Sequence, residues 1–113
     1  GPSVANVGSV GTTPISNVTI TNTTIINGVN TSSAIVVGDA TTIGNAGYFT
    51  NVTISNNNIQ RAFIGIFINA VVSAGNGNNT TVNGNLLNTS GANAIRNTGI
   101  YLQGVGSGTV NNN

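Results

Sequence analysis

Residues 51–59 read NVTISNNNI, and closely similar phrases occur three more times along the chain. The other copies are NVTITNTTI at 17–25, NTTVNGNLL at 79–87 and the shorter SGTVNNN at 107–113. Successive copies start 34, 28 and 28 residues apart. A phrase that returns at intervals of this length indicates a solenoid, in which each turn of the chain lies on the previous one.

A second phrase alternates with the first. It reads SAIVVG at 33–38, IGIFIN at 64–69 and TGIYLQ at 98–103, with spacings of 31 and 34 residues. Both phrases are of strand length and rich in β-branched residues, which favour strands. We therefore predict an all-β solenoid of about three to four coils, each 28 to 34 residues long, with connectors of variable length between the strands.

The alternation of apolar and polar residues predicts which side chains form the core, because successive side chains of a strand point to opposite faces. The predicted core positions are Ile20, Ile54, Val82 and Val110 in the first phrase, and Ile35, Ile66 and Ile100 in the second. The neighbouring residues of the first phrase are predicted to form an outward column of Thr19, Thr53, Thr81 and Thr109.

One position of the repeat holds only Asn or Gly: Asn22, Asn56, Gly84 and Asn112. These residue types adopt left-handed backbone conformations most readily, so the column predicts the same bend in every coil. Aligned Asn side chains are also expected to hydrogen-bond along the stack. An immunoglobulin-like sandwich, the main alternative fold, does not predict one bend residue in register. Low-complexity disorder does not keep apolar residues in register over four copies.

The phrase NVTISNNNI followed by GIFIN resembles the right-handed parallel β-helix repeat family, the pectate-lyase-like superfamily, over about residues 15–113. The resemblance implies three short strands per coil, an Asn-rich turn, and a secreted or cell-surface bacterial protein. Enzymes of that family carry acidic and basic residues on an outer face, often with calcium. This sequence lacks acidic and basic residues at those positions, so the resemblance supports the fold and not catalysis.

The composition excludes most site chemistry. The charged side chains are Asp39, Arg61 and Arg96, and the chain has no His, Cys, Lys or Glu, so carboxylate pairs, nucleophilic triads and imidazole or thiolate metal sites cannot form. We expect no enzymatic activity, no cofactor and no metal. A net charge of +1 is too small for nucleic-acid binding, and no apolar run approaches the roughly 18 to 20 residues that span a membrane.

For the domain organisation, residues 1–14 are interpreted as a tag remnant, Gly1-Pro2, and an N-terminal lead-in, and residues 15–113 as one solenoid. The last phrase stops midway and neither end shows a cap, which solenoids need, so we expect a fragment of a longer repeat protein. Its expected partners are a second copy stacked end to end, or flanking coils of a longer chain.

Two outer surfaces are candidate binding faces. The Thr column could bind ice, and an outward apolar stripe of Val36, Phe67 and Tyr101 could bind carbohydrate. Alternatively, a connector at 38–50 or 69–79 covers this stripe, with Tyr48 and Phe49 as the cover. The function expected first is a structural or adhesive segment, and the alternative is a binding module.

Overall fold

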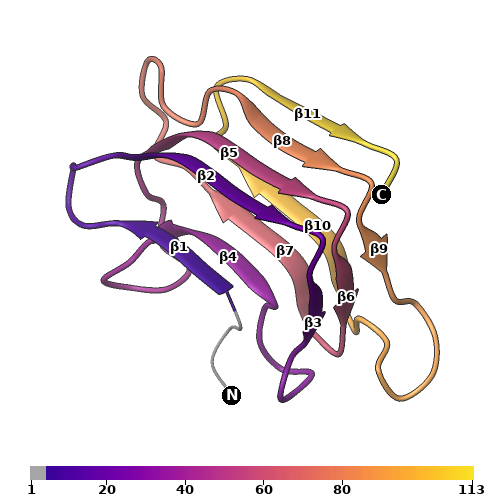
Figure 1. Cartoon of the computed structure of the whole chain (residues 1–113). Helices are drawn as coiled ribbons and strands as arrows, with labels where there is room; N and C mark the ends of the chain where they lie inside the picture. Colours follow the sequence, from indigo (N-terminus) through magenta and orange to yellow (C-terminus); the bar gives the residue numbers. More distant parts are fainter. Residues whose placement is uncertain (1–4) are drawn as a thin grey trace.

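Figure 1 shows the computed structural model, which describes residues 5–113. The Gly1-Pro2 pair lies outside these residues. The described part is all β, a parallel solenoid of about three turns with roughly 31 residues per turn. Its strands are β1 (Ala5–Ser9), β2 (Ile15–Thr21), β3 (Thr24–Ile26), β4 (Ile35–Asp39), β5 (Phe49–Ser55), β6 (Asn58–Gln60), β7 (Ile64–Asn69), β8 (Thr80–Asn83), β9 (Leu86–Leu87), β10 (Thr98–Gln103) and β11 (Gly108–Asn111). A membrane-spanning helix was sought over the same residues, and none is present.

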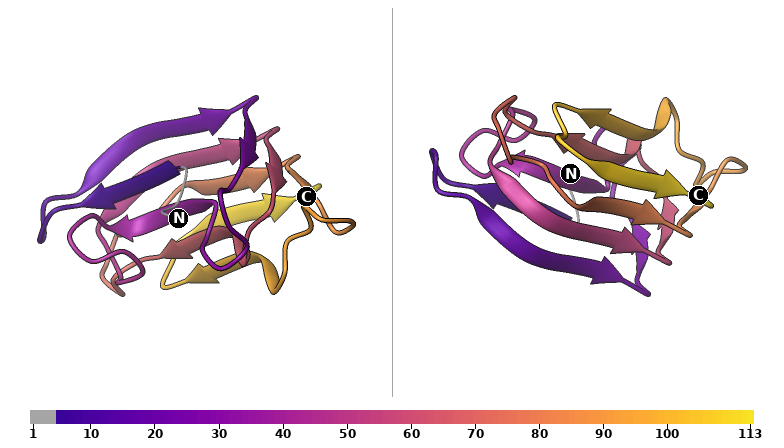
Figure 2. Two further views of the ribbon diagram at one scale, coloured as in Figure 1. Left: turned by 90° about the horizontal axis from the view of Figure 1, so that it is seen from below. Right: turned by 90° about the horizontal axis from the view of Figure 1, so that it is seen from above.

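The strands form three parallel sheets, ordered β1-β4-β7-β10, β2-β5-β8-β11 and β3-β6-β9. Each complete coil contributes one strand to each sheet, and β10 and β11 belong to a fourth coil that has no strand beside β9 among the described residues. In Figure 1 the sheet of β3, β6 and β9 closes the right-hand side between the other two. Figure 2 shows the strands of each sheet lying side by side and running in one direction.

The solenoid begins earlier than the repeat pattern predicts. Ala5 pairs with Ile35, and the rest of β1 continues in register along β4. Residues 5–9 therefore belong to the first coil and not to a lead-in. Their sequence, ANVGS, shares few letters with SAIVVG, which is why the repeat search did not include them.

The predicted core columns are in register. Ile20, Ile54, Val82 and Val110 pair in succession along one sheet, and Ile35, Ile66 and Ile100 along another. In the middle coils these side chains are fully buried, whereas Ile20 and Ile100 are half-buried. Val110 corrects the prediction, because its side chain is 48% exposed. It lies in the last coil, where no described strand covers the outer side of β11.

Small residues of the β1-β4-β7-β10 sheet make room for the third sheet. A Cβ placed on Gly65 would lie 2.7 Å from the Gly99 carbonyl oxygen and 2.9 Å from Ile95 Cδ1, and one placed on Gly99 would lie 3.0 Å from Leu87 Cδ1. The two glycines thus leave room for the neighbouring strand and for the side chains of Ile95 and Leu87. This packing lies at the end of the molecule where β9 and β10 border a hollow.

Candidate functional site

Three Asn side chains form a ladder, here called the inner Asn ladder, in which Asn57 and Asn85 are buried and Asn113 is exposed. Asn57 Nδ2 donates to Asn85 Oδ1 at 3.0 Å, and Asn85 Nδ2 donates to Asn113 Oδ1 at 2.7 Å. The backbone N–H groups of Asn57 and Asn85 donate to the same two oxygens, both at 3.1 Å. Each Nδ2 group also donates to a strand carbonyl, of Ile20, Ile54 or Val82. Asn57 and Asn85 are thus buried with their polar atoms satisfied.

The predicted bend residues lie directly before this ladder. Asn22, Asn56, Gly84 and Asn112 have φ angles of 53°, 55°, 65° and 52°. The left-handed bend precedes the buried ladder side chain in the coils of Asn57 and Asn85. The sequence indicated Asn ladders in general but not this position. The usable signal is the regular spacing of 28 residues between Asn57, Asn85 and Asn113.

A second ladder, here called the outer Asn ladder, was not found from the sequence. Asn51 Nδ2 donates to Asn17 Oδ1 at 3.1 Å, and Asn79 Nδ2 donates to Asn51 Oδ1 at 2.8 Å. All three residues are exposed and have positive φ angles. They are the first residues of three copies of the repeated phrase, a signal that could have identified them.

The predicted Thr column lies on the β2-β5-β8-β11 sheet. Thr19, Thr53, Thr81 and Thr109 pair directly from strand to strand. Beside this column, Thr21 Oγ1 and Ser55 Oγ are hydrogen-bonded at 3.0 Å. With the outer Asn ladder, these side chains give the sheet a regular polar surface.

The aromatic pair lies on the other large sheet. Val36, Phe67 and Tyr101 are in register, and the rings of Phe67 and Tyr101 stack with their centroids 4.8 Å apart and their planes 5° from parallel. The Tyr101 hydroxyl donates to Gln103. Because the Thr column and the aromatic pair belong to different sheets, they form two separate candidate faces and not one.

Val36 corrects the predicted stripe. Its side chain is 1% exposed, yet it is not part of the central core cluster that contains Ile35 and Val37. The loop between β4 and β5 lies beside it, since Ile43 and Gly44 line a hollow of about 210 Å³ together with Val36 and Phe67. The loop is held by Asn69, whose Nδ2 donates to the Gly44 carbonyl at 3.0 Å.

A connector therefore lies beside part of the stripe, but not with the residues expected. Phe49 is fully buried in the core, and Tyr48 lines a different hollow with Pro14 and Thr50. Tyr101 stays 37% exposed at the edge strand β10. Accessible aromatic surface thus remains at the end of the solenoid.

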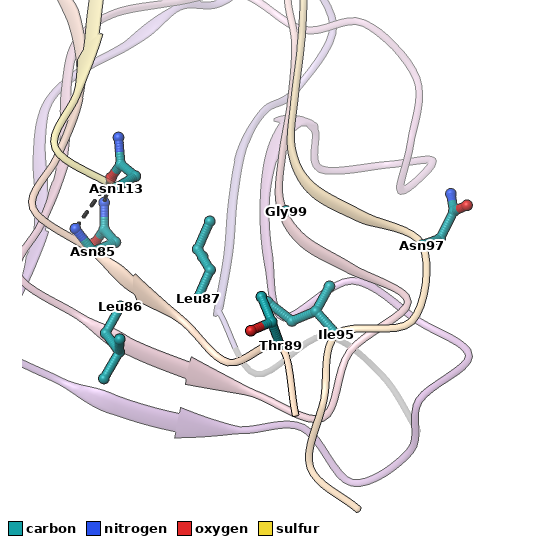
Figure 3. A pocket seen from close by; sticks show the side chains of 8 residues that line it. All are labelled: Asn85, Leu86, Leu87, Thr89, Ile95, Asn97, Gly99 and Asn113. Carbon is teal, nitrogen blue, oxygen red and sulfur yellow. Dashed lines mark hydrogen bonds between the residues drawn. The ribbon is translucent and has the colours of Figure 1, made fainter. Parts of the chain in front are cut away.

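A hollow that the sequence did not predict lies at this same end. It measures about 430 Å³ and is bounded by β9, β10 and the chain near Asn113. Figure 3 shows the residues around it, with the Asn85–Asn113 pair on one side and Ile95 and Thr89 on another. The lining residues are Asn85, Leu86, Leu87, Thr89, Ile95, Asn97, Gly99 and Asn113.

Over residues 5–113, no group of three or more His, Cys, Asp or Glu side chains comes together. No protein-family model, curated protein or solved structure matches the chain. The geometry defines a class of architecture, a parallel β-solenoid with Asn ladders and two distinct outer faces.

Proposed function

We propose that this chain is a non-catalytic structural or adhesive segment of a secreted or cell-surface bacterial protein, related to the pectate-lyase-like β-helices. The observation that carries the proposal is the inner Asn ladder. Its amides bond to both the next coil and the previous one, so the repeated Asn residues hold successive coils together. An Asn that recurs in three of the four copies of the phrase therefore serves stacking.

Burial of the ladder supports a mechanical role. Amide hydrogen bonds are stronger in a low-dielectric interior than in water, and linked bonds reinforce one another. A stack built this way resists separation of its coils, as a spacer or stalk requires. The outer Asn ladder adds the same kind of bond on the surface.

We further propose that the ends associate with another copy. The outer edges of β2 and β11 have no strand partner among the described residues, and Val110 exposes its side chain at one end while Ile20 is half-buried at the other. A second copy stacked in register would place Ile20 over Val110 and continue the core column. Unpaired edges of this kind promote strand pairing between molecules.

Light scattering coupled to size-exclusion chromatography, over a wide concentration range, tests this association. We expect dimers or longer assemblies that grow with concentration, with fibres visible by electron microscopy. A single monomeric species at every concentration contradicts end-to-end association and favours a self-contained binding module.

A binding module is the second candidate, favoured by one observation. One face of the Tyr101 ring stacks on Phe67, and beyond β10 there is no described strand to cover the other face. A sugar ring could pack there. The Tyr101→Ala variant should then lose binding on a polysaccharide panel, whereas Thr53→Val should keep it. Loss of thermal hysteresis in Thr53→Val would instead indicate ice binding on the Thr column.

A further inference from the structure

Arg61 holds a backbone conformation that is unusual for its side chain. Its φ angle is 52°, and the other non-glycine residues with positive φ among residues 5–113 are all Asn. Asn adopts this left-handed conformation readily, whereas a longer side chain does so at a cost in stability. Such strain is typical of functional sites, which points to a role for the Arg61 side chain.

The Arg61 side chain is held by the following coil. Its Nε–H donates to Asn93 Oδ1 at 3.0 Å, and its backbone N–H donates to the Asn93 carbonyl at 2.7 Å. Asn93 Nδ2 in turn donates to Gln60 Oε1 at 3.3 Å. The two terminal nitrogens of Arg61 have no hydrogen-bond partner among residues 5–113. The guanidinium is thus oriented through Nε and keeps its remaining N–H donors for a ligand.

The other arginine of the chain lies at the same corner of the solenoid. Arg96 N–H donates to the Ala62 carbonyl at 2.8 Å, so the Arg96 backbone lies beside the residue that follows Arg61. Adjacent coils are about 4.8 Å apart, and two long side chains that start at this separation can reach one ligand. Arg96 is exposed, and its guanidinium has no partner within the described part of the chain.

No acidic side chain balances these two charges at the corner. Asp39, the acidic residue of the chain, ends β4, whereas Arg61 and Arg96 come just before the starts of β7 and β10. These strands are parallel and belong to one sheet, so the Asp39 carboxylate lies at the opposite ends of the strands. There its Oδ1 accepts from Thr41 N–H at 2.6 Å. The corner therefore carries two positive charges and attracts anions.

We infer that Arg61 and Arg96 form a binding site for a tetrahedral oxyanion with two negative charges, the group present in inorganic phosphate and in phosphate esters. Guanidinium groups bind phosphate oxygens through paired N–H donors. A phosphate ester has a charge of about −2 at pH 7.5, which matches two arginines. The site lies away from the Thr column and from the edges of β2 and β11, so this inference goes beyond the proposed function.

The test is an NMR titration of the ¹⁵N-labelled chain at pH 7.5 with inorganic phosphate and with glucose 6-phosphate. Sodium chloride at equal ionic strength and glucose are the control ligands. We expect saturable shifts of the Arg61 Nε–H and of the amides of residues 60–63 and 93–97 with both phosphates and with neither control. Tighter binding of glucose 6-phosphate would identify a phosphate ester as the ligand, and tighter binding of inorganic phosphate would identify the free ion.

Arg61→Asn is the decisive variant, because Asn occupies the other left-handed non-glycine positions. The variant should unfold at the same urea concentration as the unchanged chain or at a higher one, and should bind phosphate about tenfold more weakly. Arg96→Gln should weaken binding to a similar extent. Asp39→Asn is the matched control, since it also changes the net charge by one but lies at the other ends of the strands. It should leave the affinity within about twofold.

Three results would overturn the inference: equal shifts with chloride and phosphate, unchanged phosphate affinity in Arg61→Asn, or an Asp39→Asn variant that gains as much affinity as Arg61→Asn loses. The third result would mean that net charge, and not this corner, holds the ion. All titrations are run at concentrations where light scattering reports a single species, so their outcome is separate from that of end-to-end association.

Discussion

The side chain of Asn56 fills the space beside the backbone of Gly84, one coil further along. A Cβ placed on Gly84 would lie 2.5 Å from Asn56 Oδ1, closer than real Cβ contacts come. The Asn56 side-chain oxygen therefore occupies the place that a Cβ at position 84 would take. Because Asn22 and Asn56 occupy successive coils, the bend column also accepts Asn after Asn, and Gly84 is favoured by this contact together with its left-handed φ.

Substitutions at Gly84 and Asn56 should show how much of the loss in stability comes from the steric contact and how much from the left-handed backbone conformation. Gly84→Ala should lower the free energy of unfolding by about 2 to 3 kcal/mol, because a left-handed φ costs an Ala roughly 1 to 2 kcal/mol and the contact with Asn56 adds to it. Asn56→Gly removes the contact but also relieves the left-handed φ at position 56, so it is measured alone and together with Gly84→Ala. Urea unfolding should show that Gly84→Ala costs less in the Asn56→Gly chain than in the unchanged chain, and equal costs would contradict the steric argument.

The inner Asn ladder should be a major source of stability. Asn85→Ala removes donors and acceptors from Asn57, Asn113 and the Ile54 carbonyl in a buried site, and should cost about 2 to 4 kcal/mol. Asn88→Ala, which breaks only exposed bonds with Ser90, should cost less than about 1 kcal/mol. Equilibrium urea unfolding of both variants makes the comparison, and similar losses would exclude a special role for the ladder.

Position along the stack should decide the cost of core truncation. Ile54 is buried in a middle coil, so Ile54→Ala should cost about 2 to 5 kcal/mol, and Ile54→Asp should unfold the chain. Val110→Ala, in the same column but half exposed, should cost less than about 1 kcal/mol. Thermal unfolding followed by circular dichroism distinguishes them. A large loss at Val110 would mean that another copy buries it in solution.

The loop beside Val36 should depend on one side chain. In Asn69→Ala the loop loses the hydrogen bond that holds the Gly44 carbonyl, so amide exchange should accelerate at residues 40–46. Exchange in β5 and β7 should stay slow, because their sheet bonds are unaffected. Mass-spectrometric hydrogen exchange measures both regions. Unchanged loop exchange would show that the other hydrogen bonds of the loop, such as Asp39 N–H to the Asn45 carbonyl and Thr41 N–H to Asp39 Oδ1, hold it without Asn69.

Features that repeat were predictable, because alternation and a common bend leave a mark in every coil. The columns of Ile54 and Ile66 and the residues at the Asn22 bend come directly from that repetition. Features of single coils were not. Val36 lies beside a connector whose sequence differs from those of the other coils, and β1 joins the stack through a sequence that diverges from the repeat.

In the candidate sites, too, the repeated features were predictable from the sequence and the features of single coils were not. The register of Thr53 and of Phe67 was predictable from the phrases, but their separation onto two faces needed the sheet order. The hollow beside β9 brings together residues of different parts of the repeat, such as Leu87, Ile95 and Asn113, which the phrases alone did not place side by side.

The constant bend has a consequence for molecular length. A coil advances the molecule by one strand spacing, about 4.8 Å, whether its connectors make it 28 or 34 residues long. The length of the molecule along the solenoid axis is therefore set by the number of coils and not by the number of residues. A longer connector would change the surface and leave this axial length unchanged. Gain or loss of a coil would shift all later coils along the axis by one strand spacing.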